Sequence, residues 1–227
     1  MLQHSHSALR GARRAPPRGM RRLRSIAGAA AMLFALSLIL AAPARAANAA
    51  AVVAESDDPI QVRIETSFGD MIVELWPREA PYTVRNFLKY VDRGFYDGLI
   101  FHRVIPDFMI QTGGYDAELE YRAPAGRVPN ESVGGPRNLR GTLAMARQRS
   151  PDSADSQFFV NIADNAHLDA DGMRPGYTVF GRVLRGMEVA DRIARVRTSV
   201  QADFRDVPVT PIVIEGVSRL DLDQGVE

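Results

Sequence analysis

The chain has 227 residues, with 28 basic and 27 acidic side chains, a net charge of +1 and no cysteine. This balance gives no electrostatic reason to bind nucleic acid or an anionic membrane. Without disulfides a hydrophobic core must stabilise the fold, and the length is that of one domain.

The first 46 residues differ in composition from the rest, because they hold eight arginines and no acidic residue. An apolar run, Met32–Leu40, follows most of the arginines, and Ala44-Arg45-Ala46 offers a cleavage site between small residues. This order predicts a secretory signal peptide over residues 1–46, with Met20 as the predicted true start. An uncleaved anchor is the alternative, although the apolar stretch is shorter than the about 20 residues that a spanning helix needs.

Removal of the leader changes the charge of the chain. Subtracting its eight arginines from the 28 basic residues leaves 20 against 27 acids, a net charge of −7. An acidic domain excludes nucleic acid as a partner, and no membrane contact is expected after cleavage. Residues 47–59 are rich in alanine and then in acids, which predicts a flexible linker. The folded domain is predicted over residues 60–220, with a C-terminal tail at 221–227.

The folded part begins with a strand pattern, because apolar and polar residues alternate over 60–64. Gly69-Asp70 marks a hairpin turn into a second strand over 71–76. A helix between Pro81 and Gly94 follows, since four apolar residues stand at helical spacing: Val84, Phe87, Leu88 and Val91.

Most of the remaining elements are predicted strands. They cover 99–104, 108–112, 142–146, 157–162, 178–183 and 212–217, with a second helix over 187–195. Seven or eight strands with two helices favour a closed antiparallel barrel capped by helices, although the apolar pattern alone leaves a sandwich open. The last strand is expected to pair with the first and close the sheet.

Two segments indicate the function. Residues 101–114 set Arg103 and Gln111 among large apolar side chains, on two short strands joined by a Pro-Asp turn. Residues 141–161 supply a second glutamine, Gln157, beside two phenylalanines. Neither segment contains a serine-histidine couple, a carboxylate pair or a metal cluster, so a reaction in which no covalent bond changes is indicated.

These residues resemble the cyclophilin family of peptidyl-prolyl cis-trans isomerases over roughly Ile60 to Leu220. The resemblance implies an eight-stranded barrel with a helix over each end. It also implies an enzyme without cofactor or metal that rotates X-Pro bonds in unfolded or extended polypeptides. With the leader, it predicts a monomeric periplasmic protein that assists the folding of exported proteins. A non-catalytic chaperone that binds proline segments and a membrane-tethered adaptor are the alternatives.

Arg103 is the candidate catalytic group. A guanidinium aimed at the nitrogen of a twisted imide stabilises the twisted state more than either planar state. The alternative is an arginine that extends from a barrel strand into an ion pair. Gln111 would orient Arg103 or hold the substrate carbonyl.

The resemblance also implies the substrate-binding residues. The proline pocket would be formed by apolar and aromatic side chains: Phe108, Met109, Phe159 and Leu168. Ala146 and Gln157 align with positions that bind the peptide backbone. His167 and Tyr177 stand where the family usually has other rings.

In two places, adjacent residues are expected to point to opposite faces of a strand. Phe158 and Phe159 are adjacent, so one should enter the core, and the resemblance assigns Phe159 to the pocket. His102 is predicted to face away from Arg103, as a histidine of the barrel interior with its hydrogen bonds satisfied.

Overall fold

The computed structural model describes residues 58–220. The predicted leader, most of the linker and the tail lie outside these residues, so the predictions for them stay untested. The strands are β1 (Ile60–Thr66), β2 (Gly69–Leu75), β3 (Arg103–Ile105), β4 (Met109–Thr112), β5 (Thr142–Met145), β6 (Phe158–Asn161), β7 (Val179–Arg185), β8 (Thr198–Gln201), β9 (Phe204–Pro208) and β10 (Ile214–Arg219). The α-helices are α1 (Pro81–Val91) and α2 (Met187–Ala194), and two 3₁₀ turns span Pro151–Ser153 and Ala166–Leu168.

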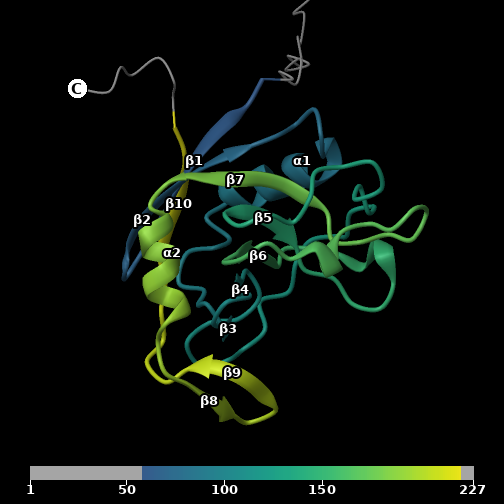
Figure 1. Cartoon of the computed structure of the whole chain (residues 1–227). Helices are drawn as coiled ribbons and strands as arrows, with labels where there is room; N and C mark the ends of the chain where they lie inside the picture. Colours follow the sequence, from purple (N-terminus) through teal and green to yellow (C-terminus); the bar gives the residue numbers. More distant parts are fainter. Residues whose placement is uncertain (1–57, 221–227) are drawn as a thin grey trace, which may run out of the picture. The chain divides into compact units, whose positions relative to one another are not determined.

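Eight of the strands form one antiparallel sheet in the order β10-β1-β2-β7-β5-β6-β4-β3 (Figure 1). The predicted pairing of the last strand with the first is confirmed, because β10 lies beside β1. The hairpin β8–β9 forms a separate two-stranded sheet that lies against β3. Sequence analysis did not predict this hairpin.

The prediction of a closed barrel is wrong in one respect, because the strand ladder is open between β3 and β10. The chain segments that precede β3 and β10 do approach each other, at an isolated bridge between Ile100 and Val213. There Phe101 N donates to Ile212 O at 3.0 Å and Gly98 N donates to Ile214 O at 2.8 Å. The chain leaves this pairing at His102, since β3 turns to pair with β4 alone. The fold is thus mainly β, an open half-barrel with two α-helices.

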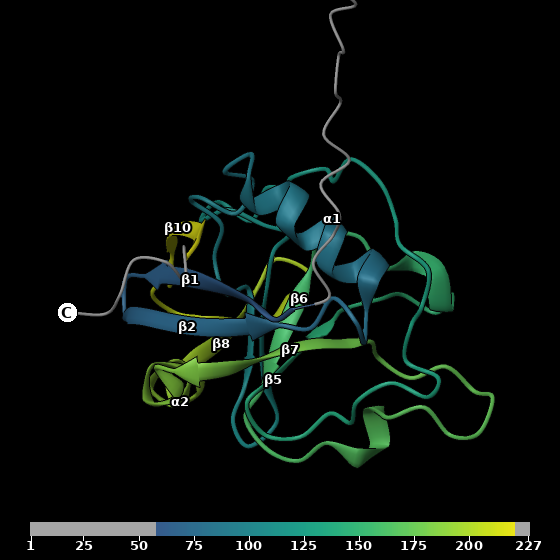
Figure 2. The ribbon, with the colours of Figure 1, turned by 90° about the horizontal axis from the view of Figure 1, so that it is seen from above.

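The main core fills the space between the sheet and the two helices, which lie on different sides of β1 and β2 (Figure 2). Four aromatic rings meet at its centre. Phe87 of α1 contacts Phe158 of β6 at 5.3 Å and Phe180 of β7 at 5.3 Å, and Tyr96 lies 5.5 Å from Phe158. The helical stripe predicted from the sequence is therefore the face that α1 buries.

Glu131, from a distant loop, caps the N-terminus of α1. The N-cap residue Ala80 has no side chain that can accept a hydrogen bond. The Glu131 carboxylate instead accepts from Tyr82 N at 3.1 Å and from Thr83 N at 2.9 Å, and Thr83 Oγ1 donates to it at 2.7 Å. A negative charge at this end also complements the helix dipole.

We expect Glu131→Gln to lower the free energy of unfolding by about 2 kcal/mol, because the amide loses the charge and turns a donor toward the helix N–H groups. Urea unfolding followed by circular dichroism measures the change. Glu79→Gln is the matched control, since Glu79 is exposed just before the same helix. An equal effect of the two substitutions would contradict the capping role.

Candidate active site

The register of three strands places the predicted polar residues on one face of the sheet. Arg103 on β3 lies opposite Gln111 on β4, and Gln111 lies opposite Phe159 on β6. Ala144 on β5 continues this row, since it pairs with Phe159. Residues directly opposite each other in a ladder point to the same side, so the arginine, the glutamine and the phenylalanine share one surface.

These side chains line a cavity of about 340 Å³. Nine of the ten residues predicted for the site lie around it: Arg103, Phe108, Met109, Gln111, Ala146, Gln157, Phe159, Leu168 and Tyr177. Segments far apart in the chain therefore converge on one place, while the role of each residue remains a prediction.

His167 is the exception, because it does not line the cavity. It lies in the turn Ala166–Leu168 and stacks on Phe108, with ring centroids 5.4 Å apart and planes at 27°. His167 is exposed and contacts the cavity only through Phe108, a residue of its wall.

Four lining residues were missed by sequence analysis: His102, Tyr115, Arg147 and Phe204. Phe204 belongs to β9 and packs on Tyr115, with ring centroids 4.8 Å apart at 75°. No local pattern could have placed Phe204 here, because it reaches the cavity only through the docking of β9 against β3. Tyr115 directly follows Gly113-Gly114, at the end of the segment that sequence analysis singled out.

The apolar part of the cavity is a small cluster separate from the main core. Its buried members are Met109, Ala144, Phe159, Leu168 and Val179. Phe158, the neighbour of Phe159, is fully buried in the main core. The alternation of a strand therefore divides the two phenylalanines as the sequence predicted, one to each side of the sheet.

The two glutamines are fixed by each other. Gln111 Nε2 donates to Gln157 Oε1 at 3.0 Å. Gly114 leaves the space that Gln157 occupies, because a Cβ at Gly114 would lie 2.7 Å from Gln157 Cδ. The amide groups are thus held in place beside Arg103.

Arg103 is 44% exposed, and its nearest acid is Asp206 of β9, with 3.9 Å between Nε and Oδ2. The Asp206 side chain is 43% exposed. A pair so long and so exposed to water contributes little to stability. The guanidinium consequently retains donors for a ligand in the cavity.

His102 differs from the prediction. It is 4% exposed and lines the cavity beside Arg103, with its ring 4.8 Å from that of Tyr115. Within the described residues its Nδ1 has no hydrogen-bond partner, so the expectation of a satisfied histidine is wrong. Burial lowers the pKa of His102 to about 4, and this effect outweighs the contacts with Ile100 and Gln157 that favour the charged form.

This lowered pKa predicts a pH dependence of stability. Between pH 6.5 and about 4 the unfolded chain binds a proton at His102 that the folded chain does not bind. We expect the free energy of unfolding to fall by about 3 kcal/mol as the pH drops through this window, and to be recovered as it rises. Urea titrations at several pH values measure the slope.

The variant His102→Gln should flatten this slope. Asp191 titrates at a lower pH than this window, because the hydrogen bond from Arg140 lowers its pKa below the usual value of 3.8. Loss of stability in the same window in His102→Gln would show that another group is responsible.

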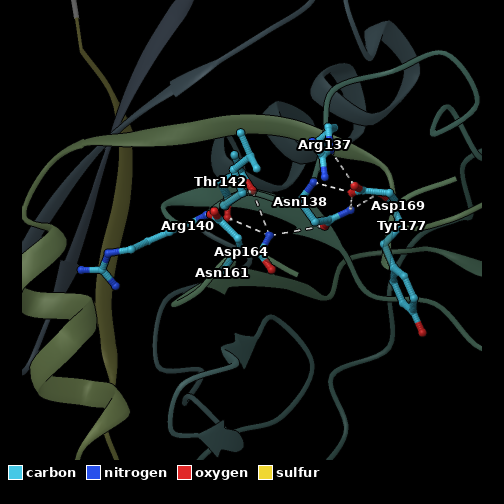
Figure 3. Close-up of polar contacts among 9 residues, drawn as sticks. Arg137, Asn138, Arg140, Thr142, Asn161, Asp164, Asp169 and Tyr177 are labelled. Carbon is cyan, nitrogen blue, oxygen red and sulfur yellow. Dashed lines mark hydrogen bonds and ion pairs between the residues drawn. The ribbon is translucent and has the colours of Figure 1, made fainter. Parts of the chain in front are cut away.

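Buried polar side chains form a hydrogen-bond network around Asn161 (Figure 3). Asn161 Nδ2 donates to Thr142 Oγ1 at 2.9 Å, and Asn165 Nδ2 donates to Asn161 Oδ1 at 2.7 Å. Asn165 Nδ2 also donates to Phe108 O at 2.9 Å, while Asn138 Nδ2 lies 3.4 Å from Tyr177 O. The network therefore ties two walls of the cavity to β5 and β6.

Asp169 anchors one end of this network (Figure 3). Its carboxylate accepts from Asn138 N at 2.7 Å and from Arg137 Nε at 3.0 Å. Burial alone would raise the pKa of Asp169, but the hydrogen bonds from Asn138 and Arg137 outweigh burial and lower it. Asp169 was not among the residues predicted for the site.

Among residues 58–220 no group of three or more potential metal-binding side chains occurs. Within the same residues, no helix has the length and hydropathy needed to cross a membrane.

Comparison with known proteins agrees with this geometry. The family described as cyclophilin type peptidyl-prolyl cis-trans isomerase/CLD matches residues 61–219. Peptidyl-prolyl cis-trans isomerase A of Dickeya dadantii is 46% identical over 186 residues, which cover 82% of this chain and 93% of that protein. Peptidyl-prolyl cis-trans isomerase B of Escherichia coli is 43% identical over 160 residues, which cover 69% and 98%.

Solved structures share the fold. The crystal structure of a Cryptosporidium parvum cyclophilin type isomerase has a TM-score of 0.61 at 24% identity, covering 72% of this chain and 99% of that one. The half-barrel with two helices is therefore a cyclophilin fold. The chain belongs to the cyclophilin family and is a peptidyl-prolyl cis-trans isomerase.

Proposed function

We propose that Arg103 and Gln111 are the catalytic residues of this isomerase, and that the cavity beside them binds the proline of an unfolded or extended polypeptide. The observation that carries the proposal is a half-exposed guanidinium on the wall of a cavity of about 340 Å³ that a small apolar cluster also lines. A proline ring requires such an apolar space, and the imide beside it requires a donor.

The chemistry needs little more than these groups. Rotation about an X-Pro bond has a barrier of about 20 kcal/mol, because amide resonance is broken in the twisted state. The twisted nitrogen then becomes a hydrogen-bond acceptor, and Arg103 would donate to it. A 10⁵-fold acceleration requires only about 7 kcal/mol, which a charged donor, an apolar pocket and fixation of the substrate can supply together.

The rest of the substrate would extend from the proline along Ala146 and Gln157. Gln157 accepts a hydrogen bond from Gln111, which fixes the amide beside the cavity. Binding of proline-containing peptides is supported by the family, since a crystal structure of the Cryptosporidium parvum relative is described as solved in the presence of the dipeptide Ala-Pro.

An assay of isomerisation tests this function. The mature protein and a peptide with one X-Pro bond are mixed, and the cis-to-trans relaxation is followed with and without enzyme. Acceleration supports the proposal. Binding of the peptide without acceleration would favour the alternative, a chaperone that only holds proline segments.

The cellular role rests on the leader. We propose that residues 1–46 direct export through the general secretory route, and that the mature enzyme is a periplasmic monomer that assists the folding of exported proteins. The order of arginines, apolar run and small residues supports this. A start at Met20 gives a leader of ordinary length, so deletion of residues 2–19 should leave export intact.

Cell fractionation and N-terminal sequencing test the route. A mature chain that begins after Ala46 in the periplasmic fraction supports cleavage. A membrane fraction that keeps the leader would support the tethered adaptor instead.

A further inference from the structure

We propose that Arg147 is a positioning residue, which fixes the ring of Tyr177 and with it one wall of the proline-binding cavity. The inference rests on the substrate site proposed above. Arg147 directly follows Ala146 at the end of β5 and is half-buried. Both Arg147 and Tyr177 line the cavity.

The guanidinium of Arg147 is held by three carbonyl groups. Nε donates to Gly176 O at 2.9 Å, Nη2 donates to Pro175 O at 3.0 Å, and Nη1 donates to Gln148 O at 3.1 Å. Two of these carbonyls belong to the residues immediately before Tyr177. The arginine thus joins the end of β5 to the segment that delivers the tyrosine.

The same guanidinium covers one face of the tyrosine. Arg147 Cζ lies 4.6 Å from the centroid of the Tyr177 ring, within the range of a cation–π contact. The Tyr177 ring also meets Phe159, with centroids 5.8 Å apart and planes at 73°. Tyr177 therefore contacts both Arg147 and the apolar wall of the cavity.

The backbone near Tyr177 has other anchors, whereas the ring is held by Arg147 and by the small apolar cluster. Gly176 N donates to Ser132 Oγ at 2.8 Å, and Asn130 Nδ2 donates to Gly176 O at 3.0 Å. Removal of the Arg147 guanidinium should leave the chain path in place and release the ring.

Arginine suits this role better than lysine. Its planar group donates to two neighbouring carbonyls with its edge and stacks on an aromatic ring with its face. A lysine ammonium keeps the charge but has no face to stack. A side chain that supplies only the positive charge should therefore not take over the role of Arg147.

Steady-state kinetics with a proline peptide test the role. We expect Arg147→Met to raise KM about tenfold, which corresponds to about 1.4 kcal/mol, with kcat within about twofold of the wild type, because Arg103 and Gln111 remain in place. Arg147→Lys should recover little of the loss. Arg149→Met is the matched control, since Arg149 is exposed two residues along the same segment, and it should behave as the wild type.

A double-mutant cycle with Tyr177→Leu separates positioning from general damage. If Arg147 acts through the ring, Arg147→Met should add little to the KM of Tyr177→Leu. A fully additive effect, a fall in kcat at unchanged KM, or complete rescue by Arg147→Lys would each overturn the inference. Thermal unfolding of the conservative Arg147→Lys variant shows whether the fold is kept when the methionine variant is unstable.

Titration calorimetry of peptide binding distinguishes a failure of this inference from a failure of the proposed function. A wild type that binds the peptide without turnover contradicts the catalytic proposal. A peptide Kd that is equal in wild type and Arg147→Met contradicts the role of Arg147.

Discussion

Replacement of Arg103 by alanine is expected to lower kcat/KM by a factor of about 10²–10³, while the melting temperature changes little. Removal of one preorganised donor to a transition state typically costs about 2.7–4 kcal/mol. The ion pair with Asp206 spans 3.9 Å between half-exposed groups, so its loss contributes little to stability. The rate of isomerisation and a thermal melt measure the two effects separately.

Two variants control this experiment. Arg205→Ala removes a neighbouring exposed arginine of β9 and should leave the rate unchanged. Asp206→Asn removes the acid opposite Arg103 and should leave the melting temperature nearly unchanged. Equal rates in wild type and Arg103→Ala would refute the catalytic role, whereas a collapsed melting temperature would favour a structural ion pair.

The adjacent phenylalanines of β6 should give the largest contrast in stability. We expect Phe158→Ala to lower the free energy of unfolding by about 3–5 kcal/mol, because the cavity it leaves lies among the rings of the main core. Denaturant unfolding measures the loss. The rate constant per folded molecule should remain close to that of the wild type.

Phe159→Ala should act mainly on substrate. Its side chain is nearly buried too, at 4% exposure, but it lines the cavity and belongs to the small cluster. We expect a smaller loss of stability than for Phe158→Ala and a higher KM for the proline peptide. If the two variants change KM alike, the cavity is not the proline pocket.

Local patterns in the sequence were sufficient for much of the fold. The helix predicted between Pro81 and Gly94 is α1, because its apolar stripe depends only on residues within the helix. The first hairpin was also predicted, although its turn lies at Ser67 and Phe68 rather than at Gly69-Asp70. Thr66 explains the shift, since its hydroxyl donates to Gly69 O at 2.6 Å and accepts from Phe68 N at 3.1 Å.

Features that depend on distant contacts were not predicted. The hairpin β8–β9 has no clear apolar alternation and is placed by its contact with β3. Phe204 could not be assigned to the site for that reason. The opening of the ladder beside β3 likewise follows from how the chain leaves the bridge at Ile100, which no local pattern records.

Residues around the cavity were named from the sequence where the family pattern is dense and missed where they depend on packing, while their roles stay predictions. Arg103, Gln111 and Phe159 belong to segments that resemble the family closely. The structure places these three residues opposite one another on three strands. The prediction that His102 faces away from Arg103 was wrong, because strict alternation does not hold before β3 begins. Arg147 has no sequence signal of its own, since its partners lie about 30 residues further along the chain.

The open ladder gives Arg103 an unusual place, on an edge strand of three residues. Edge strands lose their hydrogen bonds at a lower free energy than strands paired on both sides. We therefore expect the amides of β3 to exchange with deuterium faster than those of β5 and β6, as measured by mass spectrometry of fragments. The group proposed for catalysis would then lie on a strand that opens at a lower free energy than the strands at the centre of the sheet.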